Sequence, residues 1–230
     1  VYSGLRRINE FLNTEPSIQN SSQDELKLNG NISFKNVSFT YPESGITALK
    51  NVSFDVEQGQ TLAIIGRTGA GKSSIIHLLL RHYDTEKGEV TIDGQNIKNL
   101  NLNQFRENVG LVPQEVFLFS DTIENNIAFG YKNELPDPSI IEQAAKDAAI
   151  YSNIIEFPEG LKTVVGERGV TLSGGQKQRI SIARAIIKTP AILVFDDCLS
   201  AVDTETEDEI LKNLERIMKN RTSIIVSHRV

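Results

Sequence analysis

The segment Gly66 to Ser73 reads Gly-Arg-Thr-Gly-Ala-Gly-Lys-Ser and fits the pattern G-x-x-x-x-G-K-[ST] completely. Glycines let successive backbone N–H groups curl around phosphate oxygens, and a helix N-terminus adds positive charge there. Lys72 supplies a full charge, and the Ser73 hydroxyl can bind Mg²⁺. A glycine-rich turn that begins a helix by chance is the alternative, but the strand-like run before the segment and the helical run after it favour a phosphate loop.

A carboxylate in the second half of the chain complements this loop. Asp196 ends the apolar run Ala191 to Phe195, which is typical of a buried strand. Such a strand delivers its last side chain to the sheet edge where phosphates bind. Taken alone, an acidic residue after a strand is more often a solvated cap. Together with Lys72 and Ser73 it predicts a Mg²⁺ ligand, and the cation would neutralise charge on a transferred phosphoryl group.

A second glycine-containing segment, Leu172 to Gln176, reads Leu-Ser-Gly-Gly-Gln and precedes the helical run Lys177 to Lys188. Ser173 and Gln176 have the spacing of a capping box, so a well-capped helix is the simpler interpretation. Two adjacent glycines weaken a helix start, but they expose N–H groups to a phosphate. One domain has no use for two such cradles, unless the second one binds the nucleotide of a partner molecule.

Strand and helix patterns predict how these segments are positioned. Ile32 to Tyr41 and Val52 to Val56 alternate apolar and polar residues, with a shift that suits a bulge, and indicate an antiparallel layer. Thr61 to Ile65 is a short buried strand and Lys72 to Arg81 has helical spacing, so together they form a βα unit. Later units predict a mostly parallel core sheet: helices 180–187 and 205–218, and strands 191–195 and 223–227.

Two further regions lie outside this α/β core. The Ala-rich segment Ile140 to Ile155 indicates helices between sheet elements, and we expect a helical subdomain over residues 116–170. Ser3 to Leu12 has the apolar spacing of a helix, and the polar stretch after it, to Asn29, is typical of a flexible tether. We therefore expect residues 1–29 to be a linker and residues 30–230 to be one domain.

Taken together, these segments resemble the nucleotide-binding domain of an ABC transporter over nearly the whole chain. Gly66 to Ser73 matches the Walker A loop, Leu172 to Gln176 the signature motif and Ile192 to Asp196 the Walker B strand. The resemblance implies an α/β P-loop NTPase fold, ATP and Mg²⁺ as cofactors, and ATP hydrolysis. It also implies a second ABC subunit paired head to tail, with ATP between the Walker A loop of one domain and the signature of the other.

The resemblance assigns roles to individual residues. Tyr41 matches the aromatic that stacks on adenine, Gln114 the Q-loop glutamine and His228 the H-loop histidine. Judged alone, they would be a sheet aromatic, a turn cap and a surface histidine. The residues implied to bind ATP within the chain are Tyr41, Gly66, Arg67, Thr68, Gly69, Ala70, Gly71, Lys72, Ser73 and Ser74. Those implied to bind the partner's ATP are Leu172, Ser173, Gly174, Gly175, Gln176 and, in the D-loop, Asp203. Those implied to bind Mg²⁺ are Ser73, Gln114 and Asp196.

The position after Asp196 departs from the family pattern, which usually has a glutamate that polarises the attacking water. Here it is Asp197, whose side chain is one methylene shorter. An error of about 1 Å in the position of a base can cost on the order of 10²-fold in rate, so we expect ATP binding with slow hydrolysis. The implied catalytic set is Asp197, His228, Lys72 and Gln114. The substitution resembles the degenerate half of heterodimeric exporters, and a homodimer in which Asp197 works slowly stays open.

Two segments resemble exporters in particular. Gly166 to Gly169 is similar to their X-loop, and the helix Ser3 to Leu12 is similar to the linker that leaves their last transmembrane helix. The resemblance implies a domain that powers export, joined to a transmembrane domain of the same polypeptide at the cytoplasmic face of the plasma (inner) membrane. It also implies that the C-terminal helices usual in the family are missing after Val230.

Composition limits the other classes of function. The chain has 24 Lys and Arg against 30 Asp and Glu, so its net charge of −6 lacks the basic footprint of nucleic-acid binding. This argues against a soluble ABC-type ATPase that acts on nucleic acid. A single cysteine, Cys198, excludes an internal disulfide, and no apolar run approaches the ~20 residues that cross a bilayer. A regulatory half that binds ATP without hydrolysing it is a third class, which ATP turnover would distinguish.

Overall fold

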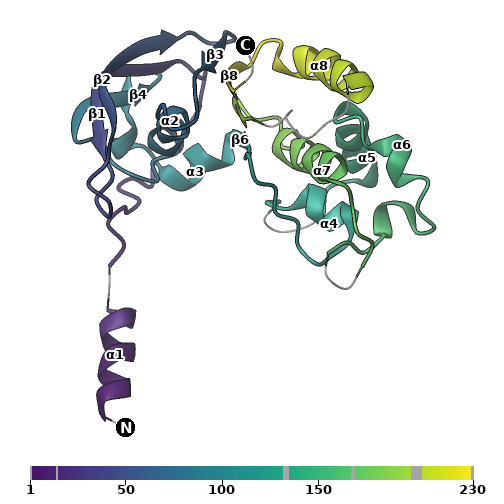
Figure 1. Cartoon of the computed structure of the whole chain (residues 1–230), viewed down its shortest axis with the longest axis horizontal. Coiled ribbons are helices and arrows are strands. Elements are labelled where there is room, and N and C mark those ends of the chain that lie inside the picture. The colour runs from purple at the N-terminus through teal and green to yellow at the C-terminus, as the bar shows by residue number, and fades with distance from the viewer. Residues whose placement is uncertain (1, 14, 132–134, 167–168, 198–203, 229–230) are drawn as a thin grey trace.

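The computed structural model describes residues 2–13, 15–131, 135–166, 169–197 and 204–228. Two sheets and several helices form two lobes that meet at the core sheet (Figure 1). One lobe holds the antiparallel sheet with helices α2 and α3, and the other holds helices α4 to α8. This arrangement confirms the expected α/β class with a parallel core sheet, an antiparallel layer and a helical part.

The antiparallel sheet has the strand order β2-β1-β4-β5. Its strands are β1 (Ile32–Thr40), β2 (Thr47–Val56), β4 (Lys87–Ile92) and β5 (Gln95–Asn96). The pairing of β1 with β2 shifts its register between Phe34 and Val37, and Asn36 there has a φ of 50°. The predicted bulge is therefore confirmed, and asparagine is one of the residues that tolerate this backbone.

The core sheet is parallel in the order β3-β8-β7-β6. Its strands are β3 (Thr61–Ile65), β6 (Val109–Val112), β7 (Ile192–Asp196) and β8 (Thr222–Ser227). Side chains alternate between its faces, so that Ile192 and Val194 join the core beneath the antiparallel sheet, while Leu193 and Phe195 join the core of the helical lobe. Burial on both faces explains why β7 is apolar until its last residue.

The helices divide between the two lobes. On the side of the antiparallel sheet lie α2 (Lys72–Leu79), η1 (Ile97–Asn99) and α3 (Leu102–Glu107). The helical lobe contains α4 (Ile123–Ala128), α5 (Pro138–Asp147), α6 (Tyr151–Ile154), η2 (Gly160–Lys162), α7 (Gly174–Ile186) and α8 (Thr204–Met218). The segment 116–170 thus carries helices, as expected, while its limits as a subdomain stay a prediction.

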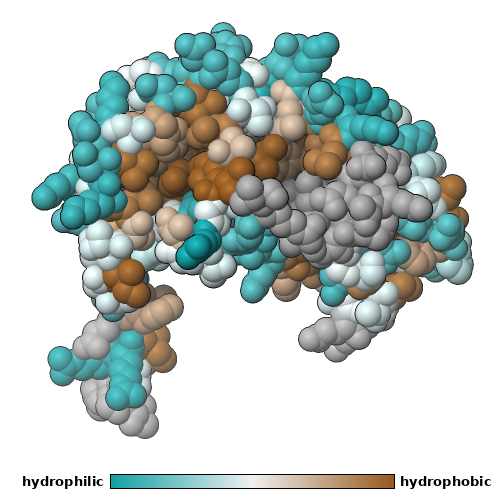
Figure 2. Space-filling view, turned by 45° about the horizontal axis from the view of Figure 1, so that its top comes forward, coloured by the Kyte–Doolittle hydropathy of each residue, from teal (hydrophilic) through white to brown (hydrophobic). Residues whose placement is uncertain are grey.

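The N-terminal helix α1 (Tyr2–Leu12) projects away from both lobes (Figure 1). Its apolar side chains are exposed, Phe11 by 81% and Leu12 by 71%, and they lie beside polar ones at the lower left of Figure 2. Among the described helices, none combines the length and the apolar composition that a membrane crossing requires.

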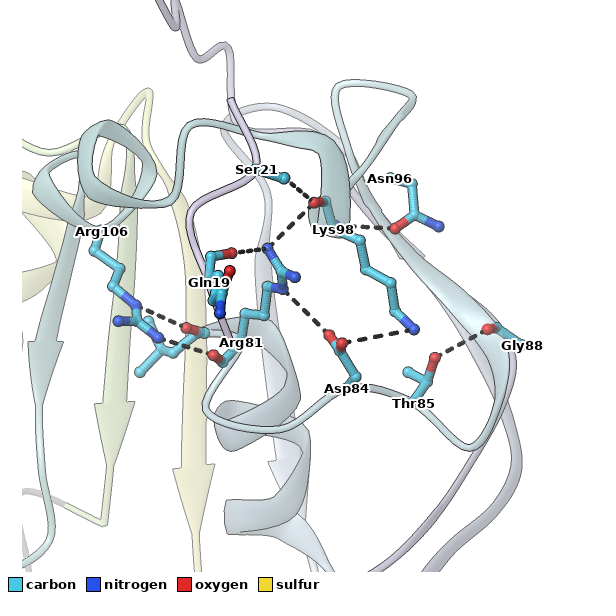
Figure 3. A network of polar contacts seen from close by, with 10 residues as sticks. Gln19, Ser21, Arg81, Asp84, Thr85, Gly88, Asn96, Lys98 and Arg106 are labelled. Carbon is cyan, nitrogen blue, oxygen red and sulfur yellow. Dashed lines mark hydrogen bonds and ion pairs between the residues drawn. The ribbon is translucent and has the colours of Figure 1, made fainter. Parts of the chain in front are cut away.

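Residues of the predicted tether contact the core, and its role as a linker stays a prediction. Arg81 donates to the backbone oxygens of Gln19 (3.4 Å) and Lys98 (3.2 Å), and its Nε pairs with Asp84 at 3.2 Å (Figure 3). The Ser21 hydroxyl also donates to the Lys98 oxygen. These contacts join residues far apart in the chain through backbone atoms, and polarity alone does not reveal them.

Candidate functional site

The phosphate loop lies between β3 and α2, where the sequence pattern placed it. Gly71 is the N-cap of α2 with a φ of 85°, and no side chain caps the helix. A Cβ on Gly71 would lie 2.5 Å from the backbone oxygen of Ala48, so only glycine fits. Gly69 also has a positive φ, of 81°. The N-terminus of α2 therefore has the backbone and the lack of a side-chain cap that suit an anion.

Lys72 folds back over this loop, and its residue is only 5% exposed. Its ammonium donates to the backbone oxygens of Gly66 (2.7 Å) and Arg67 (3.0 Å), and it lies 3.0 Å from Nδ1 of His228. Since an ammonium group only donates, Nδ1 of His228 is the acceptor in this contact. The ammonium group of Lys72 is thus held against the backbone of the phosphate loop.

Asp196 at the end of β7 lies beside the Ser73 hydroxyl. Burial raises the pKa of Asp196 above its usual value and the neighbouring charge of Asp197 raises it further, whereas the Ser73 hydroxyl lowers it. A carboxylate that is costly to bury and a hydroxyl beside it are oxygen ligands of the kind that Mg²⁺ takes. Ser73 and Asp196 therefore fit a divalent cation.

Asp197 and His228 lie next to this pair. His228 Nε2 is 3.7 Å from Asp197 Oδ2, and the side chains are 30% and 11% exposed. The backbone of Asp197 has a φ of 46°, and its N–H donates to the Val226 oxygen at 3.0 Å. The left-handed conformation favours aspartate or asparagine over longer side chains. His228 thus connects the ammonium of Lys72 to the carboxylate of Asp197.

The parallel sheet explains why residues so distant in sequence meet. Strands β3, β8, β7 and β6 end side by side, with Asp196 beside Val226 and Phe195 beside Val112. Gly66, His228, Asp197 and Gln114 follow these strand ends, because the carboxyl ends of parallel strands share one edge. Gln114 is exposed, two residues after β6 ends.

Tyr41 follows the last residue of β1 and is half-buried. Its hydroxyl lies 2.9 Å from Ser74 Oγ and 3.3 Å from His77 Nδ1, both on α2. The side chain is therefore fixed beside the helix that begins at the phosphate loop. His77 is not among the residues that the sequence motifs predict for this site. Its spacing of three residues from Ser74 indicates that both side chains lie on the same face of the helix, and this spacing could have identified it.

The signature segment lies at the start of α7, in the helical lobe rather than beside α2 (Figure 1). Ser173 Oγ accepts from the Gln176 N–H at 3.2 Å, and Gln176 Oε1 accepts from the Ser173 N–H at 2.9 Å. This confirms the capping box. Leu172 is buried, whereas Ser173 and Gly174 are exposed. Asp203, the rest of the D-loop and Cys198 lie outside the described residues.

Comparisons with known proteins agree with this arrangement. The sequence model of the ABC transporter family matches residues 49–200. The ATP-dependent lipid A-core flippase of Pasteurella multocida (strain Pm70) is 49% identical over 201 residues, which are 87% of this chain and 34% of the flippase. A probable multidrug resistance ABC transporter ATP-binding/permease protein of Bacillus subtilis (strain 168) is 45% identical over 229 residues, which are 99% of this chain and 39% of that protein.

Solved structures extend the similarity to three dimensions. The structure of a bacterial Atm1-family ABC exporter with ATP bound matches this chain with a TM-score of 0.91 and 40% sequence identity. The match covers 98% of this chain and 40% of that one. The chain thus spans from 34% to 40% of the length of these relatives.

Proposed function

This chain belongs to the ABC transporter family as the ATP-binding domain of an exporter, and we propose that it hydrolyses ATP through residues gathered at the carboxyl edge of its parallel sheet. The observation that carries the proposal is the continuous line of contacts from Lys72 through His228 to Asp197, with Asp196 and Ser73 beside it. A cation, a metal-binding pair and a carboxylate base are the parts that phosphoryl transfer requires.

The nucleotide occupies the phosphate loop in this proposal. Lys72 and the N–H groups of residues 66–74 bind the phosphates, and Tyr41 stacks on the base. Mg²⁺, bound by Ser73 and Asp196 with Gln114 nearby, supplies charge neutralisation of the phosphate oxygens. The position of the Ser73 hydroxyl beside Asp196 supports this set, because it brings two oxygen ligands together at the loop.

Water is oriented by Asp197 and His228. The Nε2 atom of His228 faces Asp197, while Nδ1 accepts from Lys72. Asp197 is the base, and its shorter side chain makes hydrolysis slow compared with a glutamate at the same position. A mainly ATP-binding, regulatory half of a heterodimer is the second candidate, and the specific observation in its favour is the identity of Asp197.

The signature segment of this chain binds the nucleotide of a second ABC subunit, and the signature of that subunit binds the nucleotide of this chain. Ser173, Gly174, Gly175 and Gln176 bind the γ-phosphate held by the partner, together with Leu172 and Asp203. The exposed position of Ser173 and Gly174 at the start of α7 supports this role. The partner is a second copy or a different ABC subunit.

Residues 1–29 form the linker from a transmembrane domain of the same polypeptide, and residues 30–230 form the ATP-binding domain. The exposed apolar face of α1, with Leu5, Ile8, Phe11 and Leu12, supports a helix that contacts another part of the protein. The domain lies at the cytoplasmic face of the plasma membrane and drives transport by ATP-dependent closure of two such domains.

ATP turnover of the full 230-residue chain tests this function. Wild type, Asp197→Glu and Lys72→Ala are compared over a range of protein concentrations, with MgATP. We expect slow turnover that rises with the square of concentration, a roughly tenfold or larger gain for Asp197→Glu, and none for Lys72→Ala. An unchanged rate for Asp197→Glu would remove Asp197 from the role of base. ATP binding without turnover in the wild type, restored by Asp197→Glu, would favour the regulatory half.

A further inference from the structure

The hydroxyl group of Tyr41 points at α2 rather than away from it. It lies within hydrogen-bond distance of two side chains, Ser74 Oγ at 2.9 Å and His77 Nδ1 at 3.3 Å. Ser74 and His77 are three residues apart and so lie on one face of the helix. One phenol is therefore anchored at two points to a single helix.

The ring of Tyr41 is held by aromatic neighbours on its other sides. Phe39 packs against it at a centroid distance of 4.8 Å and an angle of 71°, and Tyr83 at 5.4 Å and 86°. Tyr83 also lies 6.1 Å from the ring of His77. These edge-on contacts are favourable and directional, so the anchored hydroxyl and the aromatic contacts together leave the ring little freedom.

The same helix holds the phosphate loop. Ser74 is the third residue of α2 and His77 follows about one turn later, whereas Lys72 and Ser73 form the start of the helix. A ring anchored to this face keeps a set distance from the loop. The triphosphate of a bound nucleotide would then contact the start of α2, and its base would contact a ring that is anchored to the same helix.

We propose that Ser74 and His77 are positioning residues for the base of the bound nucleotide, acting through the hydroxyl of Tyr41. The proposal rests on the proposed function, in which Tyr41 stacks on the base. Preorganisation of the ring lowers the entropy lost on binding, so the anchor increases affinity for nucleotides that carry a base and leaves the affinity for the phosphate chain unchanged.

Two probes separate these effects: MgATP, which has a base, and inorganic tripolyphosphate with Mg²⁺, which has none. Dissociation constants are measured by calorimetry on the full chain, because His77 also lies in the field of Asp196 and turnover would mix two effects. Tyr41→Phe removes the hydroxyl and keeps the ring, and His77→Leu removes the ring nitrogen that contacts this hydroxyl. His77→Leu should weaken MgATP binding about five-fold, the value of one hydrogen bond. Tyr41→Phe should weaken it at least as much, because it also removes the contact with Ser74, and both variants should leave tripolyphosphate binding unchanged.

Conservative and matched variants complete the test. His77→Asn retains an acceptor near the position of Nδ1 and should restore most of the MgATP affinity. Tyr41→Phe combined with His77→Leu should lose little more MgATP affinity than Tyr41→Phe alone, because Tyr41→Phe already removes the contact with His77. Thr40→Val removes the neighbouring hydroxyl pair with Thr47, at 3.2 Å, and should leave both probes unaffected.

Three results would overturn the proposal or its premise. If His77→Leu weakened the binding of MgATP and of tripolyphosphate equally, the contact would only stabilise α2. Unchanged MgATP affinity in Tyr41→Phe, with a large loss in Tyr41→Ala, would refute the anchor while the stacking role of Tyr41 stands. Unchanged MgATP affinity in Tyr41→Ala would refute stacking itself.

Discussion

Helices α2 and α7 both begin next to glycine residues, but their N-termini are completed in different ways. At α2, Gly71 has a left-handed backbone and provides no side-chain cap, and Lys72 lies across the loop. At α7, Ser173 and Gln176 satisfy each other's backbone N–H groups in a capping box. The N-terminus of α2 has no side-chain cap of its own and lies beside groups from other strands. The N-terminus of α7 is capped by residues within its own five-residue segment, Leu172 to Gln176.

This difference indicates how the two ends serve one reaction. The start of α2 gathers a cation and, through β7 and β8, a carboxylate pair and a histidine, so it can hold and act on a phosphate chain. The start of α7 is stable without a ligand and exposes Ser173 and Gly174. It is therefore suited to meet a nucleotide that another molecule has already bound.

The largest effect should come from removing the cation at α2. Lys72→Ala removes the charged donor that we propose binds the phosphates, and MgATP affinity should fall about 100-fold. Calorimetric titration measures this loss, and circular dichroism checks that the fold is retained. The matched change at the other helix, Lys177→Ala just after the signature, should alter MgATP binding to the isolated chain by less than about two-fold. Comparable losses from both changes would contradict the comparison.

Backbone geometry gives the next effect. Gly71→Ala places a Cβ against the Ala48 oxygen and forces a positive φ on alanine, so it should lower the free energy of unfolding by roughly 2–3 kcal/mol. Gly69→Ala is the control, because Gly69 has a similar φ of 81° but no atom within 4 Å of an added Cβ. Its cost should be about 1 kcal/mol, from strain alone. Urea unfolding measures both, and equal losses would mean that the close approach to Ala48 does not matter.

Much of this architecture could be predicted from the sequence, because strands and helices carry periodic patterns. Thr61–Ile65 matched its predicted limits, and β7, β8 and α8 were placed to within one residue, whereas the predicted helix 180–187 covers only the second half of α7. The strand-end argument also predicted that Asp196 lies near the phosphate loop. Short strands without alternation, such as Val109–Val112, were not predicted, since four residues give too little pattern.

Contacts between distant residues could not be predicted in the same way. The bonds of Arg81 to Gln19 and Lys98 use backbone oxygens, which every residue carries, so no residue type marks them. The positive φ of Asp197 and the anchoring of Tyr41 by His77 depend on how β7 and β1 pack against their neighbours. The roles of Tyr41, Gln114 and His228 came from family resemblance and stay predictions about ligands.

A smaller effect should follow from removing the cap of α7. Ser173→Ala should cost about 1 kcal/mol in the free energy of unfolding, measured with urea. It should also lower the turnover that depends on the square of protein concentration, because in the proposed function Ser173 binds the partner's nucleotide. Thr122→Ala is the matched control: Thr122 caps α4 by accepting from the Asn125 N–H at 3.2 Å. It should lose similar stability and keep its turnover, and an equal fall in turnover would remove Ser173 from the partner's site.

The smallest effect concerns the other end of α2, where cations gather. Burial lowers the pKa of His82 from its usual value of 6.5, and the charges of Arg106 and His77 lower it further. Below about pH 6.5 the unfolded chain therefore binds more protons at this site than the folded chain does. The free energy of unfolding should fall as the pH drops from there through the folded pKa.

His82→Gln removes this titrating group, so its stability should decline less than that of the wild type between about pH 7.5 and pH 5.5. Urea unfolding at both values measures the difference. Arg106→Gln provides an independent check, because removing the neighbouring charge should raise the pKa of His82 as followed by NMR, whatever it does to overall stability. If the His82→Gln chain lost as much stability in acid as the wild type, protonation of His82 would not contribute to the pH dependence of stability. The contrast between α2 and α7 would then rest on their N-termini alone.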